Sequence, residues 1–143
     1  MSATNAFETD LLELIFNGTT IANIADNAAS SPATNLYVSL HTADPGEGGS
    51  QNTNETTYTS YARVAVARTS GGWTVSGNNA TNTSIITFPT CTGGSATLTH
   101  FGIGLASSST GTLLFSGELS SSLAVSNNIT PAIAAGDLDI NAD

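Results

Sequence analysis

The spacing of the apolar residues changes at Leu36, and this change limits the folds open to the chain more than any other feature. Before Leu36 the apolar residues recur at helical spacing, whereas in residues 36–41 they alternate with other side chains. A period of about 3.6 residues is typical of an amphipathic helix, and a period of two of a half-buried strand. We therefore predict a mainly β fold with a short N-terminal helical segment.

The predicted helix begins near Asn5, which forms a capping box with Glu8, and it ends at Gly18. Its apolar positions are Phe7, Leu11, Leu14 and Ile15, and the pattern continues after a break with Ile21 and Ile24. This set is too large for one narrow stripe on a helix. We therefore predict that part of it contacts another subunit or a capsid surface.

Eight short segments after Leu36 have the alternation or the β-rich composition of strands. They are residues 36–42, 61–68, 71–77, 85–89, 96–106, 113–119, 129–133 and 138–141, with turn-forming connections such as residues 76–84 between them. Many short strands with polar turns predict an antiparallel β-sandwich or jelly-roll-like domain. We expect residues 1–35 to form the helical segment and a loop, and residues 36–143 the sandwich, in one globular unit.

The charge of the chain is strongly one-sided. Arg63 and Arg68 are its only Lys or Arg residues against eleven Asp and Glu, which gives a formal net charge of −9. Phosphate backbones and anionic membranes both require clusters of cations. We therefore expect neither nucleic acid nor a membrane as a partner, and the first residues have no signal-peptide pattern.

The segment HTADPGEGG, residues 41–49, brings a histidine, an aspartate and a glutamate together within nine residues. His41, Asp44 and Glu47 could be metal ligands, and Glu55 would add an oxygen ligand for calcium. Proline and three glycines nevertheless favour a turn that Asp44 begins by bonding its own backbone. We predict this turn, with no metal and no cofactor.

No catalytic motif is evident. The serine-hydrolase pattern Gly-x-Ser-x-Gly is absent, and nothing in the sequence pairs two carboxylates for glycoside cleavage. The single cysteine, Cys91, has no neighbouring basic group to activate it, so we expect a small buried residue. The sequence predicts a protein that is not an enzyme.

The two arginines flank an alternating segment, and regular alternation would direct them to opposite faces. We predict that one of them holds a carboxylate at two points, inside the domain or at a subunit contact. Two solvated arginines are the alternative. Arg63 and Arg68 therefore join the apolar N-terminal residues as candidate interaction residues.

A family resemblance accompanies these patterns. It rests on the block from Leu36 to Arg68, which includes LYVSLHTADPG and YARVAVAR, and on the later segments GWTVSGN, ITFP, THFGIG and LLFSGEL. These residues resemble a family of small tailed-bacteriophage virion proteins that are labelled tail fibre or capsid decoration proteins. The resemblance implies a β-sandwich structural subunit displayed on a virion.

Two roles follow from this resemblance. The first is a capsid decoration, or cement, protein that is made in the host cytoplasm and binds the major capsid protein on the outer surface of the assembled head, bridging capsomers as a homotrimer. The alternative is a tail or tail-fibre component with a host-receptor or glycan-binding surface, in which Tyr58, Tyr61 and Trp73 would stack on sugars.

Overall fold

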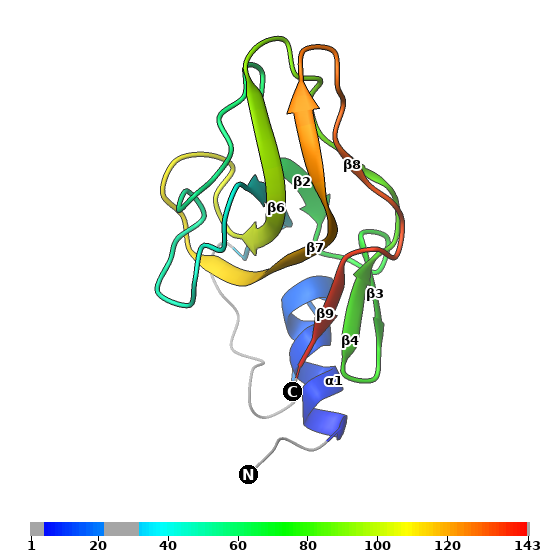
Figure 1. The fold of residues 1–143 in the computed structure, drawn as a ribbon. Coiled ribbons are helices and arrows are strands. Elements are labelled where there is room, and N and C mark those ends of the chain that lie inside the picture. Colours follow the sequence, from blue (N-terminus) through cyan, green and yellow to red (C-terminus); the bar gives the residue numbers. More distant parts are fainter. Residues whose placement is uncertain (1–4, 22–31, 143) are drawn as a thin grey trace. The chain divides into compact units, whose positions relative to one another are not determined.

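The computed structural model describes residues 5–21 and 32–142, which form two compact units. The first unit comprises Met1–Asn35, Val66–Ile86 and Ile133–Asp143, and the second Leu36–Ala65 and Thr87–Ala132. In chain order the elements are α1 (Asn5–Leu12), the π-helical turn η1 (Glu13–Asn17), β1 (Asn35–His41), β2 (Val64–Ala67), β3 (Trp73–Ser76), β4 (Asn79–Asn82), β5 (Ile86–Thr87), β6 (Ser95–Gly104), β7 (Leu113–Ser126), β8 (Ala132–Ile133) and β9 (Asp139–Asn141) (Figure 1).

The predicted fold class is confirmed: the described chain is mainly β, its strands pair antiparallel in β1–β6, β6–β7, β3–β4 and β4–β9, and its helix is short and N-terminal. The strands form a four-stranded sheet in the order β2-β1-β6-β7, a three-stranded sheet β3-β4-β9 and the pair β5-β8. No helix within residues 5–21 and 32–142 is long and apolar enough to cross a membrane.

In the first unit, α1 and η1 pack against the β3–β4 hairpin. The helical segment ends at Gly18, as predicted, because this glycine adopts φ 70° and its N–H bonds the carbonyl of Glu13. Leu12 and Phe16 are fully buried, and the Phe16 ring lies 4.7 Å from that of Trp73. The buried face therefore centres on Leu12 and Phe16, each one residue after the predicted Leu11 and Ile15. The contact with Trp73, which is distant in sequence, determines which face of the helical segment is buried.

Residues 76–84, predicted as a connection, contain a strand. Ser76 pairs with Asn79 across a two-residue loop, and β4 continues to pair with β9 on its other side. Gly77 has φ 61°, whereas Asn78 has no positive φ, the combination that a type II′ hairpin turn requires. The prediction of a loop was wrong because Asn and Thr were read as turn residues although glycine alone makes the turn.

In the second unit, β6 lies between β1 and β7. Val38 pairs with Ile103 and Leu40 with Phe101, and these four side chains are buried on one face of the sheet. The opposite face carries two rows of aligned residues: His41, His100 and Glu118 in one, and Ser39, Gly102 and Ser116 in the other. Strand β7 extends well beyond the predicted residue 119.

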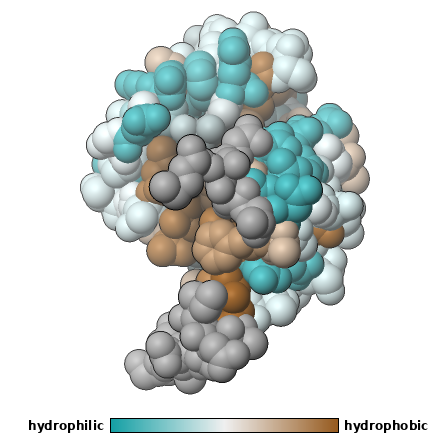
Figure 2. Space-filling model, turned by 90° about the horizontal axis from the view of Figure 1, so that it is seen from below, coloured by the Kyte–Doolittle hydropathy of each residue, from teal (hydrophilic) through white to brown (hydrophobic). Residues whose placement is uncertain are grey.

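Burial removes most large apolar side chains from the surface. Cys91 is fully buried, as predicted. Within residues 5–21 and 32–142, the large apolar residues that stay exposed are Phe7, Ile85, Leu105, Leu114, Leu123 and Ile129. On the face shown in Figure 2, apolar surface lies next to hydrophilic surface.

Candidate interaction site

The segment HTADPGEGG forms the predicted turn. The Asp44 carboxylate accepts a hydrogen bond from the Gly46 N–H at 2.8 Å, and the Gly49 N–H donates to the Gly46 carbonyl at 3.0 Å. The Asn54 amide donates to the Asp44 carbonyl at 2.8 Å, which holds the turn to the returning chain. Backbone and side-chain bonds therefore fix the position of this loop.

His41 lies beneath the loop and is fully buried. Its Nδ1 is 2.8 Å from the Thr53 carbonyl and its Nε2 is 2.8 Å from the Ser39 hydroxyl. Because a carbonyl only accepts, Nδ1 carries a proton that it donates to Thr53, while Nε2 shares a hydrogen bond with the Ser39 hydroxyl. Burial is the main cause that lowers the pKa of His41 below its ordinary value of 6.5. His41 is thus a neutral side chain that connects β1 to the loop.

The prediction that β1 is half-buried was wrong for its end. Ser39 and His41 belong to the polar row of the strand, yet both are fully buried because the chain after His41 folds back over them. Gly102 on β6 makes room for this arrangement, since a Cβ there would lie 2.7 Å from both Ser39 Oγ and His41 Nε2. A polar pair is therefore sealed under the loop.

Gln51 anchors the loop that covers Ser39 and His41 at a second point. Its side chain is fully buried, its Oε1 accepts from the Ala106 N–H at 2.8 Å, and its backbone N–H donates to the Gly111 carbonyl at 3.0 Å. Gly104 lies so close to Gln51 that a Cβ would be 2.2 Å from its amide carbon. The loop is consequently anchored to the chain that leads into β7.

Arg63 forms the predicted two-point contact, and its carboxylate is Glu55 in the same unit. Nε lies 2.7 Å from Oε1 and Nη2 lies 2.7 Å from Oε2, while the arginine also donates to the carbonyls of Ala106 and Ser109. Tyr61 donates to Glu55 at 2.8 Å. Hydrogen bonding to Glu55 raises the pKa of Arg63, and burial raises that of Tyr61. Glu55, one of the oxygen ligands considered for calcium, is therefore an ion-pair partner.

Arg68 holds the end of the N-terminal helical segment. It donates through Nε to the Ile15 carbonyl at 2.6 Å and through Nη2 to the Leu14 carbonyl, and Nη1 bonds the Ala33 carbonyl at 3.2 Å. A cation bonded to the last carbonyls of a helix offsets their partial negative charge. The alternative of two solvated arginines was therefore wrong, and their predicted role in contacts with other subunits stays a prediction.

The apolar residues predicted to make contacts differ in exposure. Phe7 is 41% exposed, Leu11, Leu14 and Ile15 are half-buried, and Ile21 is buried. Ile24 lies outside the described residues. The first four remain at least partly accessible on the helical segment.

Two of the three aromatic residues predicted to stack on sugars are buried. Trp73 is fully buried against Phe16, and Tyr58 is 4% exposed with its hydroxyl bonded to the Pro89 carbonyl. Burial also raises the pKa of Tyr58 to about 12. Tyr61 lies between Tyr58 and Phe88. Trp73 and Tyr58 are core residues, whereas Tyr61 is half-buried, so the predicted sugar stacking on Trp73 and Tyr58 was wrong.

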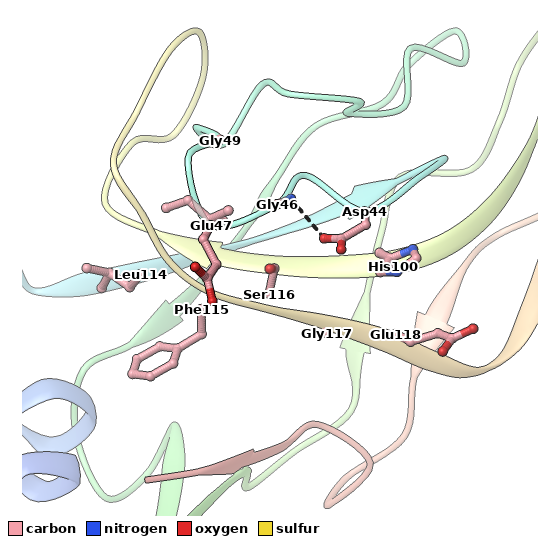
Figure 3. Close-up of a pocket in the computed structure, with 11 residues that line it drawn as sticks. Asp44, Gly46, Glu47, Gly49, His100, Leu114, Phe115, Ser116, Gly117 and Glu118 are labelled. Carbon is pink, nitrogen blue, oxygen red and sulfur yellow. Dashed lines mark hydrogen bonds between the residues drawn. The ribbon is translucent and has the colours of Figure 1, made fainter. Parts of the chain in front are cut away.

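A groove of about 640 Å³ lies between the loop and β7 in the second unit (Figure 3). Asp44 and Glu47 line it from the loop, His100 from β6, and Ser116 and Glu118 from β7. Ser116 projects toward the loop, whereas Phe115 projects to the other side of the strand. The groove is therefore the part of the sheet's polar face that the loop leaves open.

The groove brings together carboxylates that are distant in sequence, because the His100–Glu118 pairing carries β7 alongside the loop. Within the described residues, no group of three or more His, Cys, Asp and Glu side chains is arranged to hold a metal ion. The sequence revealed Asp44 and Glu47 as a pair, but Glu118 joins them only through the register of β6 and β7. No local pattern could have indicated that.

Comparison with known proteins agrees with the resemblance in the sequence. No curated protein matches the chain. A family model described as "Podophage GP4 fiber I protein gp80" matches residues 2–141. Since that match spans nearly all of the chain, the protein belongs to this family and is a phage virion structural protein.

Proposed function

We propose that this protein is a non-enzymatic structural subunit of a virion fibre, attached to a neighbouring virion protein. The observation that carries the proposal is the family match over residues 2–141, whose description names a fibre protein. The match favours the tail-fibre alternative over the capsid decoration role that the sequence alone put first.

The internal bonding of the polar residues supports a structural role. His41 has both ring nitrogens bonded, and Glu55 is paired with Arg63 and Tyr61. General acid–base catalysis needs such groups within reach of a substrate. Here they join the loop to the sheet, which suits a subunit that must keep its shape in an assembly.

Capsid decoration is the second candidate, and the helical segment favours it. Phe7 is exposed and Leu11, Leu14 and Ile15 are half-buried, so this segment offers apolar surface to a larger partner. In this role the protein would bind the major capsid protein on the outside of the head, as a homotrimer. The net charge of −9 suits the outer surface, away from packaged DNA.

Copy number and location in purified virions test the proposal. Quantitative mass spectrometry should give a ratio to the major capsid protein similar to that of tail components, and antibody-labelled electron micrographs should show the label on fibres. A ratio near that of the capsid protein, with label over the head, would instead establish decoration. Absence of the protein from virions would refute both roles.

A further inference from the structure

Asn17 and Gly18, at the end of the helical segment, form the chain's one Asn-Gly pair. In such a pair the backbone nitrogen of the glycine can attack the side-chain amide of the asparagine, and the glycine has no side chain to hinder the approach. The reaction forms a cyclic imide and converts the asparagine to aspartate. The pair is therefore a candidate site of covalent modification.

Glu13 holds both reacting groups in the folded protein. Its carboxylate Oε2 accepts from the Asn17 amide at 2.8 Å and from the Thr19 hydroxyl at 3.2 Å. Its carbonyl accepts from the Gly18 N–H and, at 3.1 Å, from the Thr19 N–H. These four hydrogen bonds, here termed the Glu13 clamp, hold both the nitrogen that attacks and the amide that leaves. The reaction therefore requires a local opening of the clamp.

The Asn17 side chain suits its place only as a neutral amide. Its Nδ2 donates to Glu13, whereas its Oδ1 is buried and has no hydrogen-bond partner among the described residues. A carboxylate at position 17 has no N–H to donate, and it would lie against the carboxylate of Glu13 one helical turn away. Negative charge is also unfavourable at the C-terminal end of a helix. Arg68 bonds the carbonyls of Leu14 and Ile15 at this end, so a new carboxylate would compete with them for its donors.

We propose that Asn17 is a deamidation site that the Glu13 clamp protects, and that its modification unlocks the end of the helical segment. When the clamp opens, the Gly18 nitrogen bonds to Cγ of Asn17 and the Cγ–Nδ2 bond breaks. The leaving nitrogen takes up the Gly18 proton and departs as ammonia. Water then adds to the imide and breaks either of its two C–N bonds, which gives aspartate or isoaspartate. Since neither product restores the clamp, the change is one-way.

The first experiment follows the unchanged full-length protein in mildly alkaline buffer, which promotes loss of the Gly18 proton. Digestion with a glutamate-specific protease and mass spectrometry of the fragments should locate deamidation at Asn17. The rate should be much lower in the folded protein than in denaturant, where the clamp is absent. Modification of another asparagine first, or equal rates with and without denaturant, would overturn the inference.

Two variants test the clamp. Glu13→Ala removes its side-chain bonds and keeps a good helix former at this position. Deamidation of Asn17 in the folded variant should be about 5- to 30-fold faster, as expected when the closed state loses one or two hydrogen bonds. Asp10→Ala is the matched control, because it removes an exposed carboxylate of α1 that is not part of the clamp. It should leave the rate unchanged, and in denaturant the unchanged protein and both variants should react equally fast. Equal rates for the two folded variants would refute the protective role of Glu13.

A third variant tests the effect of the product. Asn17→Asp should speed hydrogen exchange of the amides in Glu13–Asn17. Asn5→Asp makes the same change at the exposed N-terminal end of α1, where negative charge is favourable, so exchange should not become faster. Circular dichroism checks that the β-rich remainder of both variants is folded. Unchanged exchange in Asn17→Asp would show that modification does not unlock the segment.

The inference goes beyond the proposed function and does not rest on it. The modification acts on the helical segment, which offers apolar surface to a partner in the capsid decoration role, so ageing of the protein should loosen that surface. All of these measurements use isolated protein. Their failure is therefore distinct from a failure of the virion assignment.

Discussion

Arg63 and Glu55 form a two-point ion pair in which the arginine side chain is 2% exposed and the glutamate side chain 13% exposed. Glu55 also forms a backbone bridge with His41, and Arg63 bonds the carbonyls of Ala106 and Ser109. One ion pair thus joins the end of β1, the loop that covers it and the chain leading into β7. The position of the groove depends on this junction.

Arg63→Gln should lower the free energy of unfolding by about 3 kcal/mol, because Glu55 would stay partly buried without its cation. The double variant Arg63→Gln, Glu55→Gln should lose less stability than the sum of the single variants. Urea denaturation measures all three. Strict additivity would mean that the two side chains do not stabilise each other.

Gly102→Ala should destabilise the protein by about 1–3 kcal/mol, because its Cβ would lie 2.7 Å from the buried side chains of Ser39 and His41. Gly48→Ala is the matched control, since a Cβ there meets no atom within 4 Å. Thermal denaturation of the two variants checks the comparison. Equal melting temperatures would contradict the close packing at Gly102.

Stability should fall as the pH drops below about 6.5, because burial lowers the pKa of His41 in the folded state. In this range the unfolded chain binds the proton more readily than the folded protein, so acid favours unfolding. Glu55 opposes the shift, whereas Arg63 and His100 add to it.

The measurement is the free energy of unfolding at a series of pH values between 6.5 and 5. His41→Gln should flatten the slope in this range. An NMR titration of the His41 ring that gave a midpoint above 6.5 would contradict the assignment.

Arg68→Gln should weaken the N-terminal helical segment by about 1–2 kcal/mol, because the cation on the carbonyls of Leu14 and Ile15 is lost. Hydrogen exchange of the amides in Glu13–Asn17 should become faster. Arg68→Lys keeps the charge without the planar donor group. Its exchange rates should lie between those of the unchanged protein and those of Arg68→Gln. Unchanged exchange in both variants would show that the arginine does not stabilise the helix end.

Phe7→Ser should reduce incorporation into virions if the helical segment contacts a partner, because Phe7 is exposed and makes this surface apolar. Ile85→Ser is the control, since Ile85 is 61% exposed outside the helix. Deleting residues 1–17 is a poorer test, because it also removes Leu12 and Phe16 from the core. Equal incorporation of both point variants would remove the support for docking through this segment.

The sequence predicted what depends on neighbouring residues. The helix end at Gly18, the alternation of β1 and the Asp44 turn all follow from local spacing and local bonds. It did not predict what depends on register. The burial of His41 and the meeting of Glu118 with the loop require the pairing of β1, β6 and β7.

The two-point contact of Arg63 was predicted in part: the type of contact was predicted, but its partner was not. Its chemistry was predicted for one of the two arginines, because an arginine in an acidic chain has many carboxylates to hold. The pairing of Arg63 with Glu55 was not predicted, since nothing in the spacing of the two residues shows that the chain folds back between them. β4 was missed although Gly-Asn at residues 77–78 is a known two-residue hairpin signal.

Trp73, which packs on Phe16, and the tyrosines lie in different units, so each unit has its own optical signal. Trp73 is the only tryptophan and belongs to the first unit, whereas all three tyrosines, Tyr37, Tyr58 and Tyr61, belong to the second. Tryptophan emission therefore reports the loosening of the first unit, and tyrosine absorbance that of the second. A single denaturant titration followed at both signals would show whether the two units unfold together or in turn.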